Sequence, residues 1–99
     1  MAHRVARRAE ADLDDIWVYT AQESGSMDVA TRLIDSITDR FYFLARFPYA
    51  GRLRDRDLGV GTRSFPVGEY LIVYCVEDEN VFILRVVHGR RDFGTRFDH

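Results

Sequence analysis

Hydrophobic residues in the first half of the chain recur at intervals of three and four, which is the spacing of one face of a helix. One series runs from Ala9 to Ala21, and a longer one runs from Ala30 to Ala45. Residues 24–26 (Ser-Gly-Ser) separate the two series, and Ser26 is placed to cap the second helix. Pro48 ends the second series, because proline disfavours helical geometry at the residue before it. The pattern therefore predicts two antiparallel helices joined by a short turn.

In the second half of the chain the hydrophobic residues follow the closer spacing that is typical of β-strands. Residues 63–67 are a candidate strand, and Pro66 places it at a sheet edge or a bulge because proline cannot donate a ladder hydrogen bond. Residues 70–76 and 81–88 are apolar on both faces, which predicts two central strands. The preceding segment, residues 48–61, is interpreted as a loop.

A weak alternation at residues 3–7 predicts one further strand at the start of the chain. The predicted order is therefore strand, helix, helix, strand, strand, strand. The two helices are consecutive, and so are the last three strands. This order indicates an α+β fold in which the helical hairpin covers one face of a small, mostly antiparallel sheet. The other face of the sheet is expected to be partly open. At 99 residues, the chain is expected to form one domain, residues 1–99, around one core.

Composition narrows the class of protein. Hydrophobic residues make up 46% of the chain and charged residues 30%, which is typical of a folded protein and not of a disordered one. No apolar run reaches the ~20 residues that span a bilayer, and residues 1–4 do not resemble a signal peptide, so a cytoplasmic protein without membrane contact is expected. The single cysteine, Cys75, is interpreted as a small core residue. No metal-ligand spacing or phosphate-binding glycine loop is present, so neither a metal nor a cofactor is expected.

The charges are unevenly distributed along the chain. Residues 10–39 contain eight acidic residues and one arginine, which is a net charge of −7. The rest of the chain contains thirteen arginines and eight acidic residues, which is a net charge of +5, and there is no lysine. A general nucleic-acid binder is usually basic overall, whereas this chain has a net charge of −2. The distribution therefore predicts a local basic surface at most.

Basic residues in and after the last strands are the candidates for chemistry. Arg85 interrupts an apolar strand, so its guanidinium either pairs with an acidic residue or contacts a phosphate or carboxylate from the open face of the sheet. Arg63 has the same two interpretations. His88 is either a polar strand end or a general acid beside a bound phosphate, next to Arg90 and Arg91. This basic cluster gains weight only because five arginines could converge on it: Arg52, Arg54, Arg56, Arg63 and Arg85.

Four segments of the chain, in this order, resemble the RelE/ParE superfamily of bacterial toxins from type II toxin–antitoxin systems. They are residues 13–19 (LDDIWVY), 44–52 (LARFPYAGR), 61–74 (GTRSFPVGEYLIVY) and 83–92 (ILRVVHGRRD). The resemblance spans nearly the whole chain and implies the same order of strands and helices. It also implies a role in plasmid stabilisation and a cognate antitoxin that wraps the toxin in a hetero-oligomer.

The resemblance implies one of two activities. ParE-like members inhibit DNA gyrase and block replication without catalysis, whereas RelE-like members cut mRNA on the ribosome. The net charge of −2 and the long helical hairpin favour the ParE-like activity, in which no residue is catalytic. A homologue that has lost its toxicity and acts only in the antitoxin complex is the third alternative. In a RelE-like enzyme the catalytic residues are expected to be Arg63, Arg85 and His88.

Two sets of contact residues follow from this resemblance. A groove along the helices is expected to take an amphipathic helix of the antitoxin, while an extended antitoxin segment adds to a sheet edge. The residues predicted to contact the antitoxin are Leu13, Trp17, Tyr19, Leu33, Ile37 and Phe41. The residues predicted to contact the target are Arg63, Arg85, His88, Arg90, Arg91 and Phe93. For Phe93 the alternative is that it only seals the edge of the core.

Overall fold

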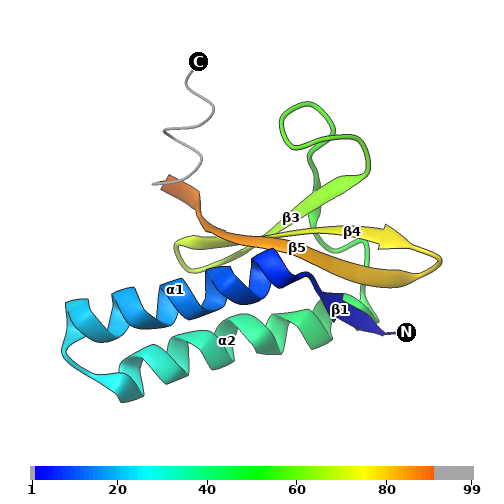
Figure 1. The fold of residues 1–99 in the computed structure, drawn as a ribbon. Coiled ribbons are helices and arrows are strands. Elements are labelled where there is room, and N and C mark those ends of the chain that lie inside the picture. Colours follow the sequence, from blue (N-terminus) through cyan, green and yellow to red (C-terminus); the bar gives the residue numbers. More distant parts are fainter. Residues whose placement is uncertain (1, 91–99) are drawn as a thin grey trace.

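The computed structural model of the protein describes residues 2–90 and contains two helices and five strands in that part of the chain (Figure 1). In chain order, they are β1 (His3–Val5), α1 (Arg7–Ser24), α2 (Met27–Arg46), β2 (Arg52–Leu53), β3 (Thr62–Val67), β4 (Tyr70–Glu77) and β5 (Asn80–His88). The predicted α+β order is confirmed, with one strand more than expected.

The five strands form one mixed sheet in the order β1-β5-β4-β3-β2. β1 runs parallel to β5, and the other neighbouring strands are antiparallel. The two helices lie side by side as an antiparallel pair and cover one face of the sheet (Figure 1). The side chains between these layers form the core, and the largest fully buried ones are Tyr74, Phe41, Ile37, Leu44, Ile72, Ile83 and Val81.

Local sequence explains where the helices end. Gly25 has a φ of 70°, which is strained for residues with a Cβ, and its N–H donates to the Ala21 carbonyl at the end of α1. The Ser26 side chain accepts a hydrogen bond of 3.2 Å from the Val29 N–H, so the predicted cap of α2 is confirmed. α2 ends at Arg46, two residues before Pro48, as the proline predicts.

β2 is the strand that the sequence analysis missed, since residues 48–61 were interpreted as a loop. It contains only two residues, which pair with Ser64 and Arg63 of β3, and two residues are too few to show a period. On one side of β3, Pro66 lies opposite Leu71 of β4. On the other side, β2 pairs only with Arg63 and Ser64, so among the described residues no strand there requires an N–H from Pro66. The predicted edge position of this proline is therefore correct at that point of β3.

A register shift in the β4–β5 pair changes the face on which the last residues of β5 lie. Tyr74 pairs with Ile83 and Val73 pairs with Arg85, which leaves Leu84 as an extra residue. Simple alternation along residues 81–88 predicts that Arg85 lies on the same face as Ile83. That placement was wrong, because one extra residue reverses the alternation after it.

Candidate functional site

Arg85 is held in an ion pair with Asp12 of α1. The Arg85 Nε donates to Asp12 Oδ2 at 2.8 Å, and Nη2 donates to Oδ1 at 3.2 Å. The Val86 N–H also donates to Asp12 Oδ2, at 2.9 Å. Of the two interpretations of Arg85, the structural salt bridge is therefore confirmed.

The position of Asp12 explains why a carboxylate is buried here. β1 covers the outer side of β5 only as far as Ile83, whose carbonyl accepts from the Ala6 N–H. Asp12, which is 7% exposed, then satisfies the next outward N–H of β5, that of Val86. The sequence analysis missed this residue, although a signal existed, because Asp12 lies three residues after Ala9 on the apolar face of α1.

His88 lies at the end of β5, beside the turn between β3 and β4. Its ring meets the Tyr70 ring edge to face, with centroids 5.3 Å apart, and its Nε2 is 3.8 Å from Glu69 Oε2. The His88 side chain is only 15% exposed. It therefore offers a small surface to a substrate or partner.

Arg63, on β3, binds the turn that follows α2. Its Nη1 donates to the Gly51 carbonyl at 2.8 Å, and its guanidinium carbon lies 5.1 Å from the centre of the Tyr49 ring. The hydroxyl of Tyr74, the residue opposite Arg63, accepts from the Gly51 N–H at 2.8 Å and donates to the Pro48 carbonyl at 2.9 Å. Burial is the main cause that raises the pKa of Tyr74 above its ordinary value.

The predicted basic cluster does not assemble. Arg63 lies opposite Tyr74 and His88 lies opposite Tyr70, so they are separated by about 13 Å along β4 alone, at about 3.3 Å per residue. Arg85 lies opposite Val73. The Val73 side chain points to one face of the sheet, whereas those of Tyr70 and Tyr74 point to the opposite face. Arg63 and Arg85 therefore do not converge on His88, because register and strand order separate these residues.

The loop arginines also lie away from β5. β2, which carries Arg52, is three positions from β5 in the sheet. Arg54 is bound to Asp57 and donates to Ser64 Oγ at 2.9 Å, and this arginine lowers the pKa of Asp57. Arg90 is exposed, whereas the predicted contact residues Arg91 and Phe93 lie outside the described residues.

The predicted antitoxin surface needs a correction. Ile37 is fully buried and Phe41 is 2% exposed, because the apolar stripe of α2 faces the sheet. These two residues belong to the core and offer no surface to a partner. Leu13 and Leu33 are half-buried and pack against that core.

Other hairpin residues are accessible. Trp17 is half-buried, and its Nε1 donates to Thr31 Oγ1 on α2 at 3.2 Å. The Tyr19 side chain is exposed, and its hydroxyl donates to Glu23 Oε1 at 3.4 Å. The sequence analysis did not single out three exposed hydrophobic residues near the turn between the helices: Val18, Met27 and Val29.

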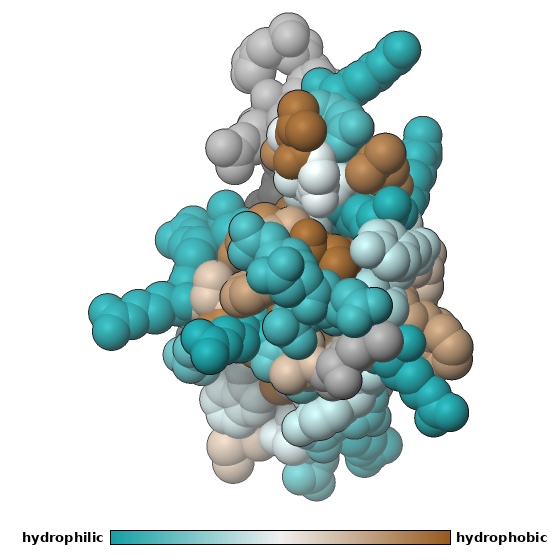
Figure 2. Space-filling model, turned by 90° about the vertical axis from the view of Figure 1, so that its right-hand side faces the viewer, coloured by the Kyte–Doolittle hydropathy of each residue, from teal (hydrophilic) through white to brown (hydrophobic). Residues whose placement is uncertain are grey.

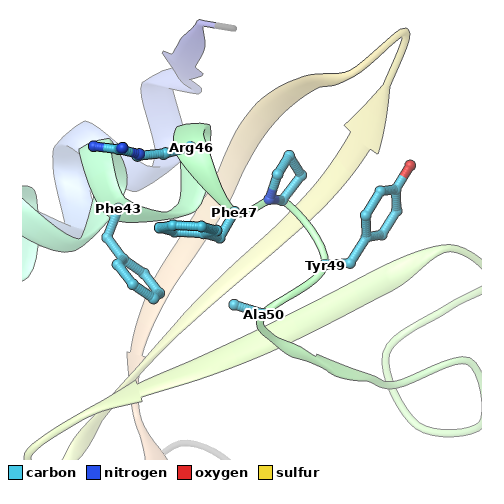
Figure 3. Close-up of a pocket in the computed structure, with 6 residues that line it drawn as sticks. Phe43, Arg46, Phe47, Tyr49 and Ala50 are labelled. Carbon is cyan, nitrogen blue, oxygen red and sulfur yellow. The ribbon is translucent and has the colours of Figure 1, made fainter.

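A second apolar surface, also missed from the sequence, surrounds the C-terminal end of α2. An open hollow of about 590 Å³ lies there, lined by Phe43, Arg46, Phe47, Pro48, Tyr49 and Ala50 (Figure 3). We call it the aromatic hollow. The hollow is formed by the last turn of α2 and the residues after it. The sequence did not reveal it, because helical spacing identifies only the apolar residues that pack against the core.

Candidate metal ligands and the single cysteine are the remaining reactive groups. Among residues 2–90, no group of three or more histidine, cysteine or acidic side chains is placed to hold a metal ion. Cys75 is partly exposed, and burial, followed by the charge of Glu77, raises the pKa of its thiol. In the same range, neither helix is apolar enough over a sufficient length to cross a membrane.

The chain matches a family of toxins over nearly all of its length. The family model described as "ParE toxin of type II toxin-antitoxin system, parDE" matches residues 4–93. The chain therefore belongs to the ParE toxin family, and the resemblance to the RelE/ParE superfamily is confirmed.

Individual relatives agree with this assignment. The chain is 35% identical to Toxin ParE1 of Caulobacter vibrioides over 86 residues, which cover 87% of this chain and 86% of the relative. It is 32% identical to Toxin ParE3 of the same organism over 90 residues, which cover 91% of this chain and 88% of the relative.

Two solved structures share the fold. A chain of the chromosomal ParDE toxin–antitoxin system from P. aeruginosa superposes with a TM-score of 0.77 at 22% identity, over 89% of this chain and 95% of the other. A chain of the RelBE2 toxin–antitoxin complex from Mycobacterium tuberculosis superposes with a TM-score of 0.65 at 29% identity, over 88% and 95% of the two chains. Both likenesses support the arrangement of two helices on a mixed sheet.

Proposed function

We propose that this ParE-family toxin inhibits DNA gyrase by binding to it, without catalysis, and that a cognate antitoxin neutralises it. The separation of Arg63, Arg85 and His88 is the observation that supports binding over catalysis. General acid–base catalysis needs groups within hydrogen-bonding reach of one reacting centre. Arg63 and His88 are about 13 Å apart along β4, and Arg85 is paired with Asp12.

The charge of the chain supports the same choice. A site on ribosomal RNA favours a protein that is strongly basic, because phosphate contacts dominate affinity for nucleic acids. This chain has a net charge of −2, and residues 10–39, which include most of the helical hairpin, carry a net charge of −7. A protein target is compatible with these charges.

The exposed end of the helical hairpin is our candidate for the antitoxin contact. Tyr19 is 46% exposed and Met27 is 68% exposed, and Trp17 lies between the two helices. Aromatic and methionine side chains are enriched in protein interfaces. The structural relatives named above are components of toxin–antitoxin assemblies, which supports an antitoxin partner and a hetero-oligomer.

The substitution His88→Ala separates the two activities. Under the proposal, growth arrest and inhibition of purified gyrase in a supercoiling assay are mostly retained, because binding needs no proton transfer and this side chain is only 15% exposed. A ribosome-dependent ribonuclease that used His88 as an acid or base would lose on the order of 10²–10⁴ in cleavage rate. The control is Glu69→Gln, which removes the neighbouring carboxylate and keeps the imidazole.

Three results would contradict the proposal. Growth arrest that disappears in a folded His88→Ala variant, together with mRNA cleavage by the wild type, would favour a ribonuclease. A wild-type chain that arrests no growth would favour a homologue that has lost toxicity. Coexpressed toxin and antitoxin that elute separately from a sizing column would exclude the neutralising complex.

A further inference from the structure

The loop between β2 and β3, residues 54–61, lies on the side of the sheet away from the helices (Figure 1). It is fastened to that side, because Arg54 Nη1 donates to Ser64 Oγ at 2.9 Å and Ser64 pairs with Val73 of β4. The Val73 side chain points away from the helices, since that of its neighbour Tyr74 points into the core. The loop therefore presents a surface that is separate from the helical hairpin.

Hydrogen bonds within the loop hold it in one shape. At its base, the Arg54 N–H donates to the Thr62 carbonyl at 2.7 Å. Further out, the Leu58 N–H donates to the Arg54 carbonyl at 2.9 Å, and the Gly61 N–H donates to Asp55 Oδ1 at 2.7 Å. The loop is therefore formed before any partner binds, which reduces the entropic cost of binding.

Val60 lies at the outer end of this loop and is 92% exposed. It stands between Gly59 and Gly61, whose φ angles of 116° and 79° are strained for residues with a Cβ. In Figure 2, hydrophobic side chains stand among projecting hydrophilic ones at the top of the molecule, the side to which the loop rises in Figure 1. Because a β-branched side chain has few rotamers, burying Val60 against a partner costs little side-chain entropy.

The charged residues around Val60 favour an acidic partner. Residues 52–61 contain three arginines and two aspartates. Both carboxylates are held by groups of the loop itself, since Asp55 accepts the hydrogen bond described above and Asp57 accepts from Arg54 Nε at 3.1 Å. The side chain of Arg56, by contrast, is exposed. An apolar side chain beside an exposed guanidinium suits an apolar pocket with a carboxylate at its rim.

We propose that the loop of residues 54–61 is the part of the toxin that binds its target, with Val60 in an apolar pocket of a protein and Arg56 against a carboxylate at the rim. This inference rests on the binding mode proposed above and adds the contact surface and the chemistry of the partner. A protein fits better than a nucleic acid, because an aliphatic side chain offers a base no ring to stack on and few phosphates are neutralised by one arginine.

The experiment measures the affinity of the full chain for immobilised, purified gyrase by biolayer interferometry. Val60→Asp is expected to lower the affinity at least about tenfold, as for an interface hot spot. Arg56→Glu is expected to lower it roughly fivefold or more, with a smaller effect at high salt. The controls are Tyr42→Asp and Arg32→Glu, both exposed on α2, which are expected to change the affinity by less than about twofold. Circular dichroism verifies that each variant is folded.

A pair of variants at Asp55 tests whether the shape of the loop matters. Asp55→Ala removes the acceptor of the Gly61 N–H and is expected to weaken binding, because the loop must then be ordered when it binds. Asp55→Asn keeps an oxygen acceptor and is expected to retain most of the affinity. Both variants remove the same negative charge, so a purely electrostatic role would change their affinities equally, and that result would overturn the positioning role of Asp55.

Wild-type affinity in both Val60→Asp and Arg56→Glu would overturn the proposal. Binding of a DNA duplex that is lost in Arg56→Glu and kept in Val60→Asp would assign the loop to nucleic acid instead. If the wild type does not bind gyrase, the proposed target is wrong and growth arrest decides about the loop: arrest that disappears in both folded variants supports it, and arrest that persists overturns it. A wild type that neither binds gyrase nor arrests growth would overturn both proposals.

Discussion

The substitution Asp12→Ala tests how far one ion pair stabilises the contact between α1 and β5. Asp12 is 7% exposed and accepts hydrogen bonds from Arg85 Nε, Arg85 Nη2 and the Val86 N–H. Removing one partner of a buried pair costs about 3–5 kcal/mol. Because 30% of the Arg85 side chain remains accessible to water, we expect a somewhat smaller loss, about 2–4 kcal/mol in the free energy of unfolding.

Urea denaturation followed by far-ultraviolet circular dichroism measures this loss. In a thermal scan, the midpoint of the 99-residue chain is expected to fall by roughly 8–16 °C, at about 4 °C per kcal/mol. The double variant Asp12→Ala/Arg85→Ala is expected to lose less than the sum of the single variants, because the second substitution removes the guanidinium left unpaired by the first.

Arg8→Ala is the matched control on the same carboxylate. The Arg8 Nε lies 3.8 Å from Asp12 Oδ1, but the Arg8 side chain is 67% exposed, so its loss is expected to cost less than about 0.5 kcal/mol. Equal destabilisation by Asp12→Ala and Arg8→Ala would show that the buried hydrogen bonds of Asp12 do not contribute several kcal/mol to the free energy of unfolding.

Two further predictions concern the core and the sheet. Tyr74→Phe is expected to lower the free energy of unfolding by about 2–3 kcal/mol in urea denaturation, since it leaves the Gly51 N–H and the Pro48 carbonyl without a partner. The control is Tyr42→Phe, at an exposed tyrosine, and a loss no larger than that of the control would refute this prediction. Cys75 is expected to react with iodoacetamide more slowly in the folded than in the urea-unfolded protein at about pH 8, because its raised pKa leaves less thiolate. Mass spectrometry follows the reaction, and equal rates in both states would contradict the prediction.

The elements of the fold were largely predictable from the sequence. The helical spacing of the apolar residues, the Ser26 cap and Pro48 set the limits of α2, and each of these signals acts over a few residues. The two central strands were equally clear, because residues 70–76 are apolar throughout and residues 81–87 are interrupted only by Arg85. Local signals of this kind depend on the order of residues and require no knowledge of the tertiary structure.

The candidate sites were less predictable, because they depend on register and on distant partners. Arg85 finds its acid 73 residues earlier in the chain, and one extra residue in β5 changes the face on which it lies. Strand order separates Arg63 from His88, although both lie beside β4. The aromatic hollow comes from a single stretch of sequence, but its shape depends on Tyr74, which lies 23 residues after Gly51. The chain alone therefore determined which segments are helices and strands, whereas only tertiary contacts decided which polar and aromatic side chains meet.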